Sequence, residues 1–133
     1  MYDHPNALLI KQAWQAVAEG DTQTLRALWT EDIEWHVTGD NPWKGSHVGT
    51  DAILEYLAQV GEAGEAYETS LEEVMVGERF SAMVCHVSAK RGNKVMENGQ
   101  VLLCRIDQGQ IAEVWTLTLD PDVFRAFWQS DRN

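Results

Sequence analysis

Apolar residues recur every three or four positions in much of the first half of the chain, a spacing typical of amphipathic helices. Residues 6–19 are predicted to form a first helix, which ends at Gly20. Asp21 is expected to cap a second helix whose buried side includes Trp29. The same spacing returns over residues 51–61 and predicts a third helix.

Alternation of apolar and polar residues predicts strands elsewhere. In the first of them, residues 32–37, Trp35 and His36 point to opposite faces. Four more strands are separated by tight turns: residues 67–76, 80–90, 94–107 and 110–119. Such turns indicate an antiparallel meander, and helices collected before it indicate an α+β fold. Residues 38–49 are predicted to be a loop and residues 121–128 a final helix.

The two longest predicted strands carry apolar residues on both faces. In residues 80–90, Met83 and Cys85 lie on one face and Ala82 and Val84 on the other. A solvent-facing side of an antiparallel sheet is normally polar. Because the chain has too few helices to cover both sides, we expect a second copy to cover one of them, giving a homodimer packed sheet to sheet.

Length and charge narrow the class of protein. The chain has 133 residues, which suits a single domain over residues 1–133. A net charge of −11 disfavours nucleic acid and anionic membranes as partners, since both bind clusters of Lys and Arg. No apolar stretch is long enough to span a membrane, and residues 1–5 lack the pattern of a signal peptide, so we expect a cytoplasmic protein.

Few residues offer chemistry. The sequence has no nucleophile triad, no phosphate-binding glycine loop and no His cluster at metal-ligand spacing, so we expect neither a cofactor nor a metal. Three titratable residues are candidates for catalysis: His36, His86 and Asp120. Each has a structural alternative, because His36 and His86 also suit partly buried positions bonded to neighbours, and Asp120 precedes Pro121 and suits a helix cap.

Tryptophan is abundant, with six in the chain. Four of them are candidate walls of a ligand pocket: Trp14, Trp35, Trp43 and Trp115. Trp43 lies in a polar loop, which suggests a lid over an apolar ligand. For Trp115 the alternative is ordinary core packing. Arg105 lies within a strand, where it either faces solvent or pairs with Glu113 across the turn at residues 108–109.

Three motifs bring a known family into view. These are Ala-Val-Ala-Glu-Gly-Asp at residues 16–21 with Glu-Asp-Ile-Glu-Trp-His-Val at 31–37, Gly49-Thr-Asp-Ala-Ile at 49–53, and Asp-Gln-Gly-Gln-Ile-Ala-Glu-Val-Trp at 107–115. In order and spacing they resemble SnoaL-like proteins of the nuclear-transport-factor-2-like superfamily, which includes ketosteroid isomerase. The resemblance covers nearly the whole chain.

The resemblance implies a conical barrel, in which a curved antiparallel sheet wraps around N-terminal helices and a deep apolar pocket, and in which dimers form through the sheet. His36, three residues before Gly39, is similar in position to the general-base Asp of the isomerases. Asp120 is the nearest match to the acid/base Asp of SnoaL-type cyclases. The isomerase Tyr that binds the oxyanion falls near Ala13 or Trp14, and neither side chain has a phenol.

Three functions therefore compete. The first is a cofactor-independent isomerase, cyclase or hydrolase acting on an apolar or aromatic substrate, with His36 as the base and the end of its strand twisted into the pocket mouth. The second is a protein that binds a small apolar or aromatic molecule without turnover. The third is an interaction module with a filled interior. A titratable pair within about 3 Å in the pocket favours the enzyme, a pocket lined by tryptophans with only one polar group favours binding, and a filled interior leaves the third.

Overall fold

The computed structural model describes residues 4–129, so residues 1–3, part of the segment judged for a signal peptide, lie outside the described residues. The helices are α1 (Pro5–Glu19), α2 (Thr22–Leu28), α3 (Thr50–Glu62) and α4 (Pro121–Trp128). The strands are β1 (Trp29–Val37), β2 (Gly45–Val48), β3 (Ala66–Met75), β4 (Phe80–Arg91), β5 (Lys94–Asp107) and β6 (Gln110–Thr118). The predicted α+β class is confirmed.

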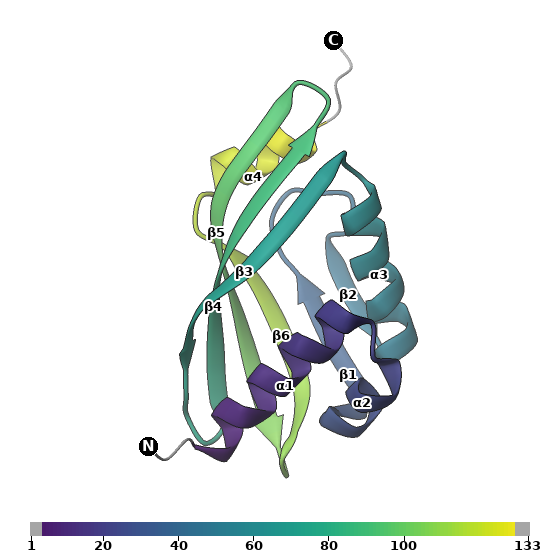
Figure 1. Cartoon of the computed structure of the whole chain (residues 1–133), viewed down its shortest axis with the longest axis vertical. Helices are drawn as coiled ribbons and strands as arrows, with labels where there is room; N and C mark the ends of the chain where they lie inside the picture. Colours follow the sequence, from purple (N-terminus) through teal and green to yellow (C-terminus); the bar gives the residue numbers. More distant parts are fainter. Residues whose placement is uncertain (1–3, 130–133) are drawn as a thin grey trace.

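The six strands form one sheet in the order β2-β1-β6-β5-β4-β3. Strands β3 to β6 make the predicted antiparallel meander. Strand β1 joins the meander by running parallel to β6, so the first strand of the chain lies beside the last. Figure 1 shows the sheet curving around α1 and α3, as in the predicted conical barrel.

Beyond shifts of one residue at several ends, two strands differ from the sequence prediction. Strand β1 begins at Trp29, where a helix residue was expected, because Trp29 pairs with Ile111 of β6 and its side chain packs inward. Strand β2 lies inside the segment predicted as a loop. Its four residues have no apolar alternation and three are exposed, so only pairing with β1 defines them as a strand.

The helix ends follow the local sequence. Gly20 ends α1 with a left-handed backbone (φ 68°), and its N–H bonds the carbonyls of the last turn. The Asp21 carboxylate accepts the Thr24 N–H at 3.1 Å and so caps α2. These two adjacent residues turn the chain between α1 and α2, and α2 then leads directly into β1.

Irregular pairing bends the sheet. The register shifts within β1 between Trp29 and Glu34, within the β3–β4 pair after Leu71, and within the β5–β6 pair after Arg105. A register shift arises where one strand has an extra residue relative to its partner, and such a bulge bends the strand and increases its twist. The concave face is closed by α1 and α3, and the core lies between them and the sheet.

Both cysteines are free and buried, as expected for small core residues. Within residues 4–129, no helix has the length and apolar character needed to cross a membrane.

Candidate functional site: a cavity with uncharged walls

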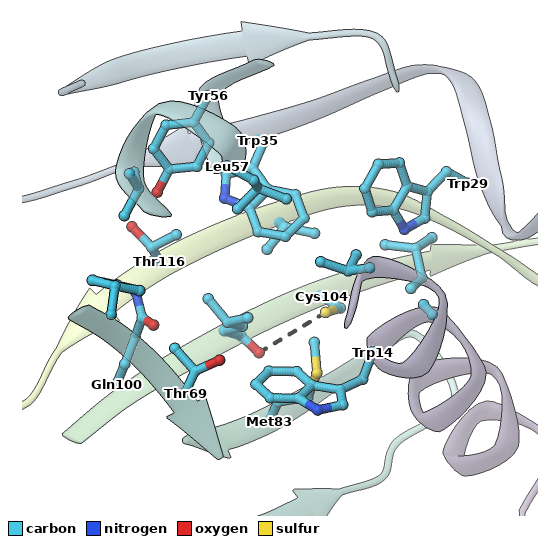
Figure 2. A pocket seen from close by; sticks show the side chains of 17 residues that line it. Trp14, Trp29, Trp35, Tyr56, Leu57, Thr69, Met83, Gln100, Cys104 and Thr116 are labelled. Atoms are coloured by element: carbon cyan, nitrogen blue, oxygen red, sulfur yellow. Dashed lines mark hydrogen bonds between the residues drawn. The ribbon is translucent and has the colours of Figure 1, made fainter. Parts of the chain in front are cut away.

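A cavity of about 220 Å³ lies between α1, α3 and the concave face of the sheet. Figure 2 shows the side chains of 17 residues around it. Large aromatic rings make much of its wall: Trp14, Trp29, Trp35, Tyr56 and Tyr67. All but one of the lining residues are buried or half-buried. The exception is Thr69, which is exposed on the edge strand β3.

Regular secondary structure positions these side chains. In α1, Ala13 and Val17 are four residues apart and therefore share one face. In β5, Gln100, Leu102 and Cys104 alternate along the strand and all point inward. The phase of β6 changes after Ile111, because the register shift beside Ala112 turns Val114 and Thr116 inward instead of Glu113 and Trp115.

Among residues 4–129, no Asp, Glu, His, Lys or Arg lines the cavity. Its polar groups are the phenols of Tyr56 and Tyr67, the hydroxyls of Thr69 and Thr116, the amide of Gln100, the indole N–H of Trp29 and the thiol of Cys104. Burial raises the pKa of Tyr56, and raises that of Tyr67 to about 12. Burial likewise raises the pKa of the Cys104 thiol to about 12. At neutral pH the walls therefore carry no charge.

None of the three predicted catalytic residues lines this cavity. His36 lies on the outer face of β1, because Trp35 and Val37 point inward and the strand alternates. The resemblance had suggested that the end of this strand twists and brings His36 to the pocket mouth. In the structure, the imidazole stays on the outer face. His86 is also on the outer face, where its Nε2 lies 2.6 Å from Glu97. Asp120 caps α4 by accepting the Val123 N–H at 3.2 Å.

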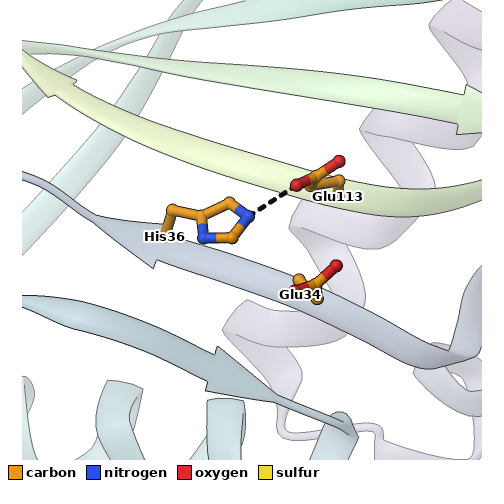
Figure 3. A group of neighbouring side chains, drawn as sticks. All are labelled: Glu34, His36 and Glu113. Carbon is orange, nitrogen blue, oxygen red and sulfur yellow. Dashed lines mark hydrogen bonds and ion pairs between the residues drawn. The ribbon is translucent and has the colours of Figure 1, made fainter.

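His36 belongs to a polar cluster on the outer face of the sheet (Figure 3). Its Nε2 lies 2.6 Å from Glu113 Oε2 and its Nδ1 2.7 Å from Ser46 Oγ. The Arg105 guanidinium donates to the other oxygen of Glu113 at 3.0 Å, which is one of the two arrangements expected for Arg105. Desolvation opposes ionisation of Glu113, but the hydrogen bonds and charges of His36 and Arg105 outweigh it and lower its pKa.

The same cluster is where the described residues come nearest to a metal site. Glu34, His36 and Glu113 offer ligand atoms within 4.8 Å of one another. Both oxygens of Glu113 are already bonded, however, one to the imidazole and one to Arg105. A cation bound there would displace one of these bonds and face the positive guanidinium. The donor set suits an ion-pair network better than a metal.

The predicted tryptophans divide into two groups. Trp14 and Trp35 line the cavity. Trp115 lies on the outer face, where its ring stacks on His36 with centroids 5.5 Å apart. Trp43 does not line the cavity either. It packs edge-on against Trp128 of α4 at 4.9 Å, and its N–H donates to Gln59 at 3.0 Å.

The sequence reasoning missed several lining residues. The sequence predicts a helix-core position for Trp29, and five aromatic and polar lining residues are not among the predicted site residues: Tyr56, Tyr67, Thr69, Gln100 and Thr116. The alternation along residues 94–107 does indicate Gln100. It shares a strand face with Leu102 and Cys104, so it is a polar residue on a face predicted to be buried. Nothing local marks Thr116, whose face depends on the register shift in β6.

Comparison with known proteins agrees with this architecture. The SnoaL-like domain family matches residues 10–114. Bal32a, from a soil-derived mobile gene cassette, is 23% identical with a TM-score of 0.84, and the match covers 94% of this chain and 97% of that one. An NTF2-like protein from Burkholderia xenovorans LB400 is 22% identical with a TM-score of 0.82, covering 97% and 99%.

TerC, whose structure was obtained by co-crystallisation with polyporic acid, is 15% identical with a TM-score of 0.80, and the match covers 96% of this chain and all (100%) of TerC. At these identities the likeness shows the shared fold. No curated protein matches the chain by sequence.

Proposed function

The chain belongs to the SnoaL-like domain family, and from that premise we propose that it binds a small, uncharged, mostly apolar or aromatic molecule in the cavity and does not transform it. One observation carries the proposal: aromatic rings form much of the cavity wall, and none of the described residues that line it is Asp, Glu, His, Lys or Arg. Transferring an ion into such a site is costly without a paired charge, whereas an apolar ring gains from leaving water.

The same observation separates binding from the enzyme hypothesis. A general acid or base must come within hydrogen-bond reach of the reacting group, directly or through one water. His36, His86 and Asp120 lie outside the lining, and the raised pKa of Tyr67 keeps its phenol protonated. The walls can therefore hold and orient a neutral molecule, but they offer no proton acceptor that titrates near neutral pH.

Calorimetric titration with three naphthalene derivatives tests the proposal. These are 1-acetonaphthone, which is neutral, 1-naphthoate, which is anionic, and 1-naphthylmethylammonium, which is cationic. We expect the neutral ketone to bind at least about tenfold more tightly than either ion, because burying an unpaired charge costs more than 1.4 kcal/mol.

Two variants in α3 locate the binding site. Leu57 and Leu54 are both half-buried, but only Leu57 lines the cavity. Leu57→Trp should fill part of the cavity and weaken binding of 1-acetonaphthone, and Leu54→Trp should leave it within about twofold. Equal affinity for all three compounds, or equal effects of the two variants, would show that the cavity is not the binding site.

A further inference from the structure

The indole N–H of Trp29 is a hydrogen-bond donor without a partner. Trp29 is only 2% exposed, and no hydrogen bond within residues 4–129 engages its side chain. Two polar side-chain atoms in that range are fully buried and have no hydrogen-bond partner: Thr30 Oγ1 and Trp35 Nε1. Trp29 Nε1 is not one of them, so it is not fully enclosed by protein, and the residue that carries it lines the cavity.

Figure 2 shows how this donor is placed. The indole nitrogen of Trp29 is on the ring edge turned toward the side of the cavity where Cys104 and Trp14 lie. The hydroxyl-bearing residues Tyr56, Thr69 and Thr116 and the amide of Gln100 gather at the opposite end. The cavity thus has an isolated donor at one end, a mixed polar group at the other, and apolar walls between them.

Indole is a donor only, whereas hydroxyl and amide groups both donate and accept. Buried donors are nearly always satisfied in folded proteins, because an unpaired one loses its bond to water without replacement. The Trp29 end of the cavity is therefore complementary to an oxygen that accepts a hydrogen bond and carries no charge. A ligand with a hydrocarbon group at this end would leave the Trp29 N–H without a partner. A ligand with its own N–H there would place two donors against each other.

We propose that Trp29 Nε1–H orients the ligand by donating a hydrogen bond to an uncharged acceptor oxygen of the ketone or ether type. This inference rests on the proposed binding function and narrows its ligand class from apolar or aromatic molecules in general to those with an acceptor at one end. Trp29 binds and orients the ligand in this scheme and takes no part in chemistry.

The test compares 1-acetonaphthone with 1-ethylnaphthalene, which has nearly the same shape but no acceptor oxygen. In the wild-type protein the ketone should bind more tightly. Trp29→Phe keeps an aromatic ring and removes the N–H, so it should weaken ketone binding about threefold to tenfold and change hydrocarbon binding much less. Trp35→Phe is the matched control. Its N–H is sealed from the cavity, so it should change both affinities alike.

A second measurement observes the indole N–H groups of the wild-type protein directly. In a ¹H–¹⁵N spectrum of the wild-type protein, one of the six indole N–H signals should move downfield on adding the ketone and not on adding the hydrocarbon. That signal should be the one absent from Trp29→Phe. If both compounds bind, but Trp29→Phe weakens them equally and no indole signal separates them, the inference fails and the proposed function stands. If neither compound binds the wild-type protein, both fail.

Discussion

Charged and uncharged side chains are segregated between the two faces of one sheet. Trp35 and His36 are neighbours in sequence, yet one lines the cavity and the other belongs to the outer cluster with Glu113 and Arg105. The alternation of a strand produces this separation, and it decides which chemistry is available on each side. Hydrogen-bonded ions can stabilise the outer face, while the uncharged inner face is the basis of the proposed preference for neutral ligands.

The Glu113 carboxylate should make the free energy of unfolding depend on pH in the acid range. Its pKa is lowered in the folded protein, so its contribution is fully present above the ordinary value of 4.5 and is lost as the pH falls through the folded value. We expect the free energy of unfolding of the wild-type protein, measured in urea, to drop below pH 4.5. Glu113→Gln should be less stable at pH 7 and should lose less on acidification.

The control for this prediction is Glu34→Gln, which removes a carboxylate from the same cluster but breaks no hydrogen bond of Glu113. It should alter the acid response less than Glu113→Gln does. An unchanged acid response in Glu113→Gln would show that the bonds from His36 and Arg105 do not stabilise its ionised form.

Two glycines three residues apart, one in the last turn of α3 and one before the start of β3, differ in the space around their Cβ positions. Gly61 is within the helix, and a Cβ built on it meets nothing within 4 Å. A Cβ on Gly64 would lie 2.5 Å from the backbone carbonyl oxygen of Lys90, the same oxygen that accepts the Glu65 N–H at 2.9 Å. Close approach of the backbones at Gly64 thus allows the β3–β4 pairing to begin.

Replacing each glycine with alanine should therefore have effects of opposite sign. Gly61→Ala should stabilise the protein by about 0.5–1 kcal/mol, since alanine loses less backbone entropy in a helix. Gly64→Ala should destabilise it by about 1–3 kcal/mol, because backbone cannot yield as a flexible side chain does. Urea denaturation of both variants measures this, and a Gly64→Ala protein as stable as wild type would contradict the proposed backbone clash.

An apolar strip crosses the outer face of the sheet. Phe80 and Leu117 are 40% and 42% exposed, and the rings of Phe80 and Trp115 are 6.3 Å apart. The polar clusters around His36 and His86 lie on the same face. Contiguous exposed apolar surface on a folded protein commonly marks an interface. We propose that this strip is the seam of the sheet-to-sheet homodimer expected from the sequence.

Sedimentation at micromolar concentration should then give a mass of about 30 kDa, twice the 15.0 kDa of the chain. Leu117→Glu should yield a folded protein of half that mass. In a dimer with twofold symmetry, the substitution places one glutamate from each subunit in the apolar interface, and burying these charges opposes association. Leu8 is similarly exposed, at 46%, but belongs to α1, so Leu8→Glu should leave the dimer intact. A wild-type monomer would rule out the seam.

The periodicity of the sequence by itself determined most of the fold. Residues 94–107 and 121–128 were predicted at the bounds that β5 and α4 have, and Gly20 and Asp21 marked a helix end and a cap correctly. These features depend on interactions within a few residues, such as backbone bonds of one turn or a strand's alternation, so they can be read locally.

Only the tertiary structure decided the site. Strand β2 exists through pairing with β1, the inward turn of Thr116 depends on a register shift against β5, and Trp29 reaches the cavity because β1 pairs with the distant β6. The resemblance placed His36 in the pocket, but the alternation of β1 about the buried Trp35 puts it outside. A site of this kind is assembled from strands that are far apart in sequence. One residue of slip in any of them exchanges the side chains that line the cavity with those that do not.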